Sequence, residues 1–422
     1  MLLLYDNLVI INGNLMLKKY TIKITIIIAI SIIFCSVCAL AATTDKSIPI
    51  AGEAQQFSYL AKSFLEKKLY FLEQPGTWDD TAVYKGKHYW PQGPLPAVLL
   101  MPFVYIANHC NIFFKQIFLQ IWLLLGIFYL TFLLAKRNGF LKIDSYFLAF
   151  AFCLSSTFLG VGLISWSWQY AQVVTTFLLF LSLVEYTGQK RYWIIGLLMG
   201  LVLLTRMTAA LGIIFFCFAI LYKSSKKIKD ILCLLVPFGI MGLILAVYNY
   251  ARFDNVFVQG YMYQLLAVDV SFKAREYGLL GFVHLPTNLY YFLLSCPLPV
   301  FQEGTHILEY PFIRANPWGM SIFITSPYLM YLFLLKYHGW EARSILITTF
   351  FISLPIFLYY ASGYWQFGYR YSLDFLPFLH FLLIRGMDKK IITDKFKLLI
   401  IGSSFFNLFL YNTLWQNGRA IG

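Results

Sequence analysis

Charged side chains are scarce in this chain. They make up 12% of its 422 residues, whereas 60% of the residues are hydrophobic. Soluble globular domains carry about 25% charged residues, so the shortage of charge excludes an ordinary soluble fold. A lipid bilayer is therefore expected to be the main solvent of this protein.

Several chemical motifs are also missing from the sequence. It has no Gly-rich phosphate-binding loop, no Walker-type motif and no Ser-His-Asp arrangement, which disfavours nucleotide-driven chemistry in the cytoplasm. The seven cysteines lack the spacing of metal ligands or of a disulfide framework, so we interpret them as packing residues. No internal repeat is present, although membrane transporters tend to carry one.

Positive charge is the exception to the general shortage, with a formal net charge of +14. The basic residues occur in short clusters between apolar runs and not along one solvated face, so we expect no nucleic-acid partner. We interpret the clusters as topology signals that favour the cytoplasmic side of a membrane. They lie at residues 18–23, 136–142, 190–191, 223–229, 336–343 and 385–397.

Apolar runs recur along the chain, and at about 20 residues they are long enough for a helix to cross the hydrocarbon core. Residues 24–42 and 117–135 are examples. The runs are solidly apolar, whereas a membrane β-barrel needs alternating apolar and polar residues. The sequence thus predicts an all-α polytopic membrane protein, with roughly ten transmembrane helices in a single membrane domain covering residues 1–422.

The basic clusters also predict which segments lie outside. Met16 and the two lysines after it resemble the start of a signal anchor, so residues 24–42 are expected to form the first transmembrane helix, with Met16 as an alternative start. With every basic cluster in the cytoplasm, residues 43–92 and 252–316 form the two long extracytoplasmic segments. We expect an integral, multi-pass protein of the plasma (inner) membrane.

Two apolar stretches depart from simple crossings. Residues 94–108 contain three prolines and are too short for a span, which predicts a half helix. The stretch between the clusters at 190–191 and 223–229 is interrupted at Arg206. Because both clusters are expected inside, this stretch predicts two short helices with Arg206 at their turn.

Four segments of the chain carry a family resemblance. They are GEAQQFSYLAKSFLEKKLYF (52–71), DDTAVYKGKHYWPQGPLPAVLLMPF (79–103), YNYARFDNVFVQGY (248–261) and GYWQFGYRYSLDFLPFL (363–379). In this order they resemble the GT-C superfamily of membrane glycosyltransferases, in particular bacterial relatives of protein mannosyltransferases and of lipid A aminoarabinose transferases. The resemblance implies a GT-C-like bundle with extracytoplasmic loop helices. It also implies transfer of a sugar from a polyprenyl-phosphate-linked donor to a glycan, lipid or protein acceptor at the extracytoplasmic face.

An inverting transfer of this kind requires a carboxylate base near the membrane face. Glu53 follows the first predicted helix closely and suits that position, although it can instead cap the next helix and complement its dipole. Many relatives carry Asp at this place, so Asp45 is an alternative base. Asp79 and Asp80 are next in line.

The donor phosphate requires cationic partners, and guanidinium groups suit it best because they can bind in bidentate fashion. Arg370 is the first candidate, with Gln366 before it and Asp374 placed to orient it one helical turn later. Arg370 can alternatively extend to lipid headgroups. Arg252 and Arg275 are weaker candidates for phosphate contact.

The remaining expectations concern cofactors and competing functions. His88 could join the acidic residues around a divalent metal, but no paired spacing supports a metal site, and the cofactor stays unknown. The expected partners are the polyprenyl-phosphate sugar and membrane lipids; the oligomeric state is left open. A polyprenyl-linked glycan flippase, or a polymerase or ligase of surface glycans, remains an alternative.

The predicted topology can be tested with reporter fusions. Reporters fused after Tyr59 and Lys273 should read extracytoplasmic, whereas fusions after Lys227 and Lys390 should read cytoplasmic, because the basic clusters stay inside. A cytoplasmic signal at Tyr59 would reverse the predicted orientation.

Overall fold

The computed structural model describes residues 54–266, 269–337, 339–387 and 390–416. The first predicted transmembrane helix, residues 24–42, lies outside the described residues. The same holds for Asp45 and Glu53, the two carboxylates predicted as bases.

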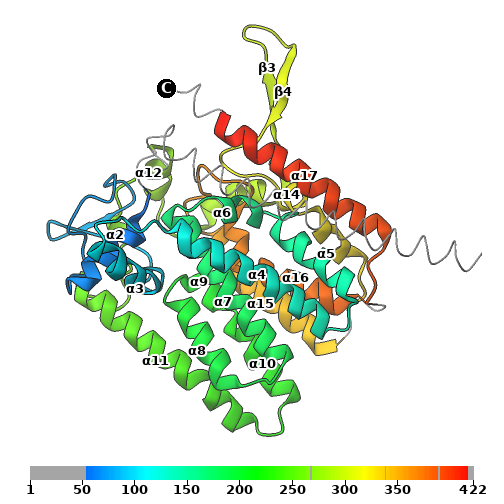
Figure 1. Cartoon of the computed structure of the whole chain (residues 1–422), viewed down its shortest axis with the longest axis horizontal. Coiled ribbons are helices and arrows are strands. Elements are labelled where there is room, and N and C mark those ends of the chain that lie inside the picture. Colours follow the sequence, from blue (N-terminus) through cyan, green and yellow to red (C-terminus); the bar gives the residue numbers. More distant parts are fainter. Residues whose placement is uncertain (1–53, 267–268, 338, 388–389, 417–422) are drawn as a thin grey trace, which may run out of the picture. The chain divides into compact units, whose positions relative to one another are not determined.

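The described chain is mostly helical, as expected (Figure 1). Five of its helices are long and apolar enough to cross a membrane, namely α4 (Ile117–Arg137), α7 (Ser167–Thr187), α11 (Lys227–Phe253), α15 (Gly339–Phe357) and α17 (Asp394–Gln416). The shorter helices are α2 (Gln56–Leu65), α3 (Leu95–His109), α5 (Lys142–Cys153), α6 (Phe158–Leu163), α8 (Tyr192–Leu203), α9 (Met207–Ala210), α10 (Ile213–Lys223), α12 (Asp269–Arg275), α13 (Leu285–Leu289), α14 (Ile322–Thr325) and α16 (Leu376–Gly386). The described residues therefore contain five candidate spanning helices, whereas roughly ten were predicted for the whole chain.

Several predicted helices match closely. The apolar run 117–135 is α4, and the half helix predicted at 94–108 is the 15-residue helix α3. The stretch interrupted at Arg206 forms two short helical pieces, α8 and then α9 with α10, and Arg206 lies at the turn between them.

Two further apolar runs do not form single continuous helices. The run 143–163 is divided into α5 and α6, and the Ser156 hydroxyl at the break accepts a hydrogen bond from the Phe158 N–H, in competition with the helical backbone. The run 321–335 is the short helix α14 followed by the 3₁₀ helix η4 (Pro327–Leu334). Pro327 explains this change, because proline disfavours helical geometry at the residue before it.

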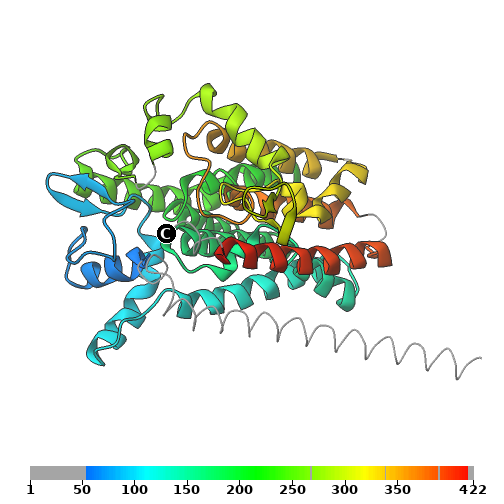
Figure 2. The same cartoon turned by 90° about the horizontal axis from the view of Figure 1, so that it is seen from above.

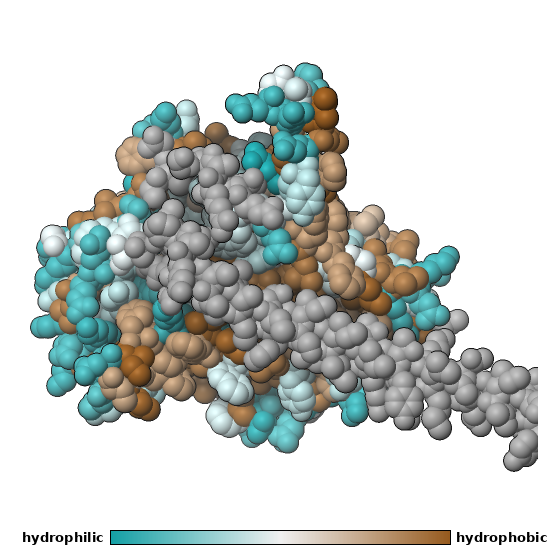
Figure 3. Space-filling view, turned by 45° about the horizontal axis from the view of Figure 1, so that its top comes forward, coloured by the Kyte–Doolittle hydropathy of each residue, from teal (hydrophilic) through white to brown (hydrophobic). Residues whose placement is uncertain are grey.

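Helix α7 occupies the centre of the described helices, between α4 and α8 (Figure 1). In its most apolar stretch 83% of the residues are buried, against 17% for α11. A helix that is apolar nearly all round has to be surrounded by protein, whereas α11 presents large apolar side chains outward, among them Leu243 and Val247. Hydrophobic surface covers much of the helical region in Figure 3, as expected for contact with lipid.

Helices α8 and α11 pack closely because of two glycines. A Cβ atom added to Gly196 would lie 2.0 Å from the Leu234 carbonyl oxygen, and one added to Gly200 would lie 2.6 Å from the Met241 side chain. Gly196 and Gly200 are four residues apart and share one face of α8. Small residues in this spacing let the backbones of membrane helices approach each other.

Two small hairpins interrupt the expected all-α structure. Strands β1 (Ala82–Tyr84) and β2 (Lys87–Tyr89) pair through a tight turn in which Lys85 and Gly86 both have positive φ. This hairpin packs against Phe253 at the end of α11. Strands β3 (Leu298–Phe301) and β4 (Leu308–Arg314) form a hairpin that projects beyond α17 in Figure 1. Both hairpins belong to the segments predicted to lie outside.

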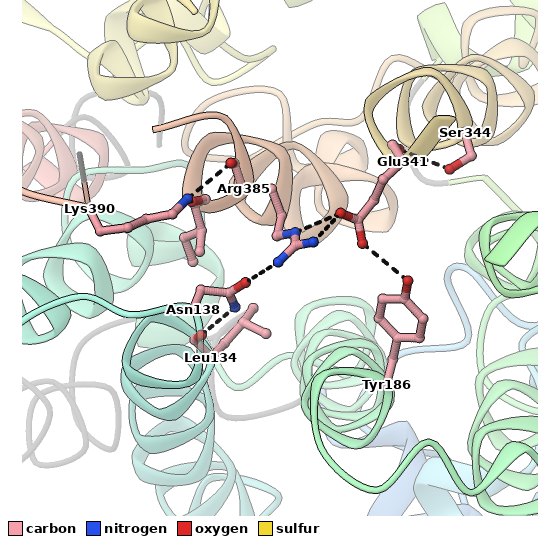
Figure 4. Close-up of polar contacts among 8 residues, drawn as sticks. Leu134, Asn138, Tyr186, Glu341, Ser344, Arg385 and Lys390 are labelled. Atoms are coloured by element: carbon pink, nitrogen blue, oxygen red, sulfur yellow. Dashed lines mark hydrogen bonds and ion pairs between the residues drawn. The ribbon is translucent and has the colours of Figure 1, made fainter. Parts of the chain in front are cut away.

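The opposite ends of the helices carry the basic clusters. Arg385 at the end of α16 donates from Nε to Glu341 at the start of α15 over 2.7 Å and from Nη1 to Asn138 after α4 over 2.9 Å (Figure 4). The Tyr186 hydroxyl in the last turn of α7 donates to Glu341 over 3.1 Å. The Lys223 ammonium lies 5.4 Å from the centre of the Trp340 ring. Clusters that are far apart in the sequence therefore meet at one end, while cluster 18–23 lies outside the described residues.

The close packing of α8 on α11 gives a stability prediction. Gly196→Ala should lower the free energy of unfolding by about 1–3 kcal/mol, because the new methyl group overlaps the Leu234 backbone. Gly239→Ala on α11 is the matched control. A Cβ atom there meets nothing within 4 Å, so this change should be neutral or stabilising by about 1 kcal/mol. Thermal unfolding in detergent measures both, and equal effects would contradict the proposed contact.

Candidate functional site

The first turn of α7 brings together two chain segments that were predicted to carry the chemistry. Trp168 Nε1 donates a hydrogen bond to Asp80 Oδ2 over 3.0 Å, and Gln172 Nε2 donates one to the Arg370 carbonyl oxygen over 3.1 Å. Trp168 and Gln172 are four residues apart and therefore lie on the same helix face. The Asp80 side chain and the Arg370 backbone are thus bonded to one face of α7, and the Arg370 charge is close enough to act on the Asp80 carboxyl and lower its pKa.

Asp80 is held by two hydrogen bonds. Besides Trp168, Gln264 Nε2 donates to Asp80 Oδ1 over 2.9 Å. Each carboxylate oxygen receives one hydrogen bond and keeps capacity to accept another. The Asp80 backbone has a φ of 63°, a left-handed conformation that aspartate tolerates better than most residues.

The surroundings of Asp80 change its acidity. The residue keeps part of its surface accessible, but its carboxyl group lies among densely packed neighbours. Burial raises the pKa of this carboxyl above its ordinary value, and this effect exceeds the lowering by the two hydrogen bonds and by the Arg370 charge. A carboxylate with a raised pKa holds a proton more firmly, which suits a general base.

The Arg370 guanidinium is buried and unpaired. The residue is only 6% exposed, and its Nε and Nη1 atoms have no hydrogen-bond partner in the part of the chain that the structure describes. Its one recorded side-chain contact is with the Tyr371 ring, whose centre lies 5.0 Å from the guanidinium carbon. A buried charge without a partner is costly, and an anion placed against this guanidinium would remove that cost.

Asp374 does not orient Arg370, and this prediction was wrong. Asp374 pairs instead with Arg206, through Nε to Oδ1 at 2.7 Å and Nη2 to Oδ2 at 3.1 Å, and it also accepts a hydrogen bond from the Thr208 hydroxyl. The reason is local geometry. Residues Arg370–Asp374 form the 3₁₀ helix η5, in which about three residues make a turn, so residues four apart do not share a face.

Gln366 supports the loop before η5. Its side-chain amide donates to the carbonyl oxygens of Trp318 at 2.8 Å and Ser362 at 2.9 Å, and its Oε1 accepts from the Arg370 backbone N–H at 3.4 Å. Gln366 therefore holds the backbone of Arg370 and leaves the guanidinium free.

Arg252 and Arg275 are already engaged with protein groups. Arg252 donates from Nη1 to the Trp90 carbonyl oxygen over 2.6 Å, and its guanidinium carbon lies 3.9 Å from the centre of the Tyr248 ring. Arg275 donates from Nη1 to the Gln264 carbonyl oxygen over 2.7 Å. These contacts make both arginines positioning residues, because Arg275 holds the segment that supplies Gln264 to Asp80.

Asp79 and His88 lie beside the site, and neither side chain is hydrogen-bonded to Asp80 or Arg370 in the described part of the chain. Asp79 is exposed and accepts a hydrogen bond from the Thr77 hydroxyl at 2.8 Å. His88 stacks on Trp78 with ring centres 3.9 Å apart, and burial lowers the pKa of its imidazole. Among the described residues, no group of three or more His, Cys, Asp or Glu side chains is placed to hold a metal ion.

Sequence reasoning missed Trp168, Gln172 and Gln264 as partners of the charged pair. The indole N–H of Trp168 bonds to Asp80. A usable signal was present in α7, where polar side chains recur at helical spacing near the start of an otherwise apolar helix.

The roles predicted for Asp45 and Glu53 stay predictions, because both residues lie outside the described part of the chain. The first described residue, Ala54, has its carbonyl oxygen bound by the N–H of Ser167 at 3.1 Å, next to Trp168.

Comparison of the chain with family models, with curated proteins and with solved structures finds no match.

Proposed function

We propose that this protein is a membrane enzyme that transfers a group from an anionic lipid to an acceptor hydroxyl. More particularly, it is a GT-C-type hexosyltransferase that uses a polyprenyl-phosphate-linked sugar as donor and a glycan, lipid or protein as acceptor. The observation that carries the proposal is the buried, unpaired Arg370 guanidinium beside the Asp80 carboxylate. The Arg370 guanidinium suits a phosphate anion, and the Asp80 carboxylate suits the role of a base.

The two ends of α7 support an extracytoplasmic site. Trp168, which holds Asp80, lies in its first turn, and Tyr186, which contacts the Glu341–Arg385 pair, lies in its last. The 18 residues between them correspond to about 27 Å of helix, close to the thickness of the hydrocarbon core. Since basic loops favour the cytoplasm, the site belongs at the outer face of the plasma (inner) membrane.

The proposed step uses the two groups in different roles. Arg370 binds the donor phosphate and stabilises the negative charge that grows on it as it leaves. The acceptor oxygen attacks the anomeric carbon of the sugar and forms the new glycosidic bond. The bond from that carbon to the phosphate oxygen breaks, the acceptor proton passes to Asp80, and the lipid phosphate leaves with the bonding electrons. The configuration at the anomeric carbon is inverted.

The local charge balance favours a monophosphate donor. Arg206 and Asp374 neutralise each other, so Arg370 is the one unpaired guanidinium described beside Asp80. A sugar linked through one phosphodiester carries one negative charge, which one guanidinium matches. A glycan flippase would need no base at this place, and a polymerase or ligase using a diphosphate-linked glycan would bring a second negative charge.

The base is tested by Asp80→Asn. Asparagine still accepts a hydrogen bond but takes no proton, so turnover should fall by about a hundred to ten thousand fold while donor binding persists. The wild-type rate should fall as the pH decreases through the raised pKa of Asp80, because a base works only when deprotonated. The measurement is turnover against pH with purified protein and labelled polyprenyl-phosphate sugars.

Asp254→Asn is the control for Asp80→Asn, because Asp254 is an exposed carboxylate that pairs with Lys85 at 2.6 Å. It should keep full turnover. Glu53→Gln and Asp45→Asn are measured in parallel. If Asp80→Asn stays active and one of these two is inactive, the base is that residue and not Asp80.

The phosphate partner is tested by Arg370→Ala and Arg370→Lys. Loss of a hydrogen bond to a charged group costs about 1.5–3 kcal/mol, so the donor KM of the alanine variant should rise by about ten to a hundred fold. Lysine keeps the charge without the planar fork and should recover part of the loss. Arg191→Ala, which removes an exposed arginine paired with Glu185 far from the site, should leave the donor KM unchanged. Wild-type kinetics in all three would leave Arg370 as a headgroup anchor.

A further inference from the structure

Several buried polar atoms on α7 and in the segment before α3 have no partner among the described residues. They are both side-chain polar atoms of Gln92, Oε1 of Gln169, Oε1 of Gln172 and Oγ1 of Thr176. None of these side chains is more than 2% exposed. Burying an amide or hydroxyl without a hydrogen bond is unfavourable, so a gathering of such atoms indicates a ligand or ordered water.

The three residues from α7 form one stripe. Gln169, Gln172 and Thr176 are spaced three and four residues apart, which places them on one face of the helix. Gln172 faces η5, because its Nε2 is bonded to the Arg370 carbonyl oxygen. The stripe therefore begins in the first turn of α7, next to Trp168 that holds Asp80, and continues past Gln172, which holds the Arg370 backbone.

Gln92 approaches the same place from the first outer segment. Trp90, two residues before it, lies against Trp168 with ring centres 5.0 Å apart. Gly93, directly after it, packs on the Leu204 backbone, where an added Cβ would lie 2.0 Å from the carbonyl oxygen. Gln92 is thus flanked by the start of α7 and by the turn that carries Arg206.

All of these unpartnered groups are uncharged. Of the nearby carboxylates, Asp374 is neutralised by Arg206, and Asp80 is the base that the proposed step reserves for the acceptor hydroxyl. Amides and hydroxyls both donate to and accept from sugar hydroxyls, but they do not compensate an ammonium group in a buried site.

We infer that Gln92 and the α7 stripe form the subsite for the sugar ring of the donor, and that this subsite selects an uncharged, hydroxyl-rich hexose over a sugar that carries a free amine. The inference rests on the proposed transferase function. A substrate that leaves buried polar groups of the site unpaired is strongly disfavoured against one that pairs them. The uncharged subsite is therefore expected to set the preference for a hexose over an amino sugar.

The first experiment compares donors on the full-length protein in lipid nanodiscs. The two donors are a polyprenyl-phosphate hexose and a polyprenyl-phosphate amino sugar with a free amine. The kcat/KM for the hexose should exceed that for the amino sugar by at least about tenfold, since one lost or unsatisfied buried hydrogen bond costs about 1–3 kcal/mol. A preference for the amino sugar would overturn the subsite and leave the transferase function standing.

The second experiment removes the unpartnered groups. Gln92→Leu breaks no hydrogen bond within the described protein, so it should lower kcat/KM for the hexose about tenfold without lowering the thermal unfolding temperature. Gln92→Glu adds a carboxylate and should shift the preference toward the amino sugar.

A matched pair of threonines gives the control. Thr176 and Thr348 are both fully buried, and both have an unpartnered hydroxyl, but Thr348 lies on α15 away from the stripe. Thr176→Val should lower kcat/KM for the hexose, whereas Thr348→Val should leave it unchanged.

The outcomes separate the two proposals. If the wild type turns over the hexose and both Gln92→Leu and Thr176→Val match it, the unpartnered atoms serve ordered water only and the subsite is wrong. If the wild type consumes neither donor, the transferase function itself fails.

Discussion

The ion pair between Arg206 and Asp374 is the interaction on which the rest of the site depends. Removing one partner of such a buried pair leaves an uncompensated charge, at a cost of about 3–5 kcal/mol. The pair ties the turn between α8 and α9 to η5, and η5 carries Arg370. Because Asp374 is already paired with Arg206, Arg370 keeps its charge available inside the protein. The Arg206–Asp374 pair thus leaves the Arg370 guanidinium without a carboxylate partner among the described residues.

The two ends of helix α7 hold different groups of residues. Its first turns hold Asp80 and the Arg370 backbone through Trp168 and Gln172, and its last turn joins the network of Glu341 and Arg385. The apolar residues between the two ends are buried by neighbouring helices. The Asp80 and Arg370 contacts and the Glu341–Arg385 network therefore lie at opposite ends of one helix.

Much of the helical framework could be predicted from the sequence, because long apolar runs leave few alternatives. Helix α4 begins at the expected residue, and Arg206 lies at its expected turn. Asp80 comes from the first predicted outer segment, its partner Gln264 from the second, and Arg370 from the predicted site region before α16. The partner of Asp374 could not be predicted, because an α-helical spacing was assumed where the chain forms a 3₁₀ helix. The Trp168 contact was also out of reach, since it joins residues 88 positions apart. Asp45 and Glu53 stay predictions.

The charged pair is assembled from opposite parts of the chain. Asp80 belongs to the first outer segment to be synthesised, Trp168 and Gln172 follow, and Arg370 arrives only after α15 has been made. A growing chain therefore carries the carboxylate for most of its synthesis without the cation beside it. A product that stops before η5 keeps α4, α7, α11 and α15 but lacks both the Arg370 guanidinium and the Asp374 carboxylate, so Arg206 is left at its turn without the partner that neutralises it in the complete protein.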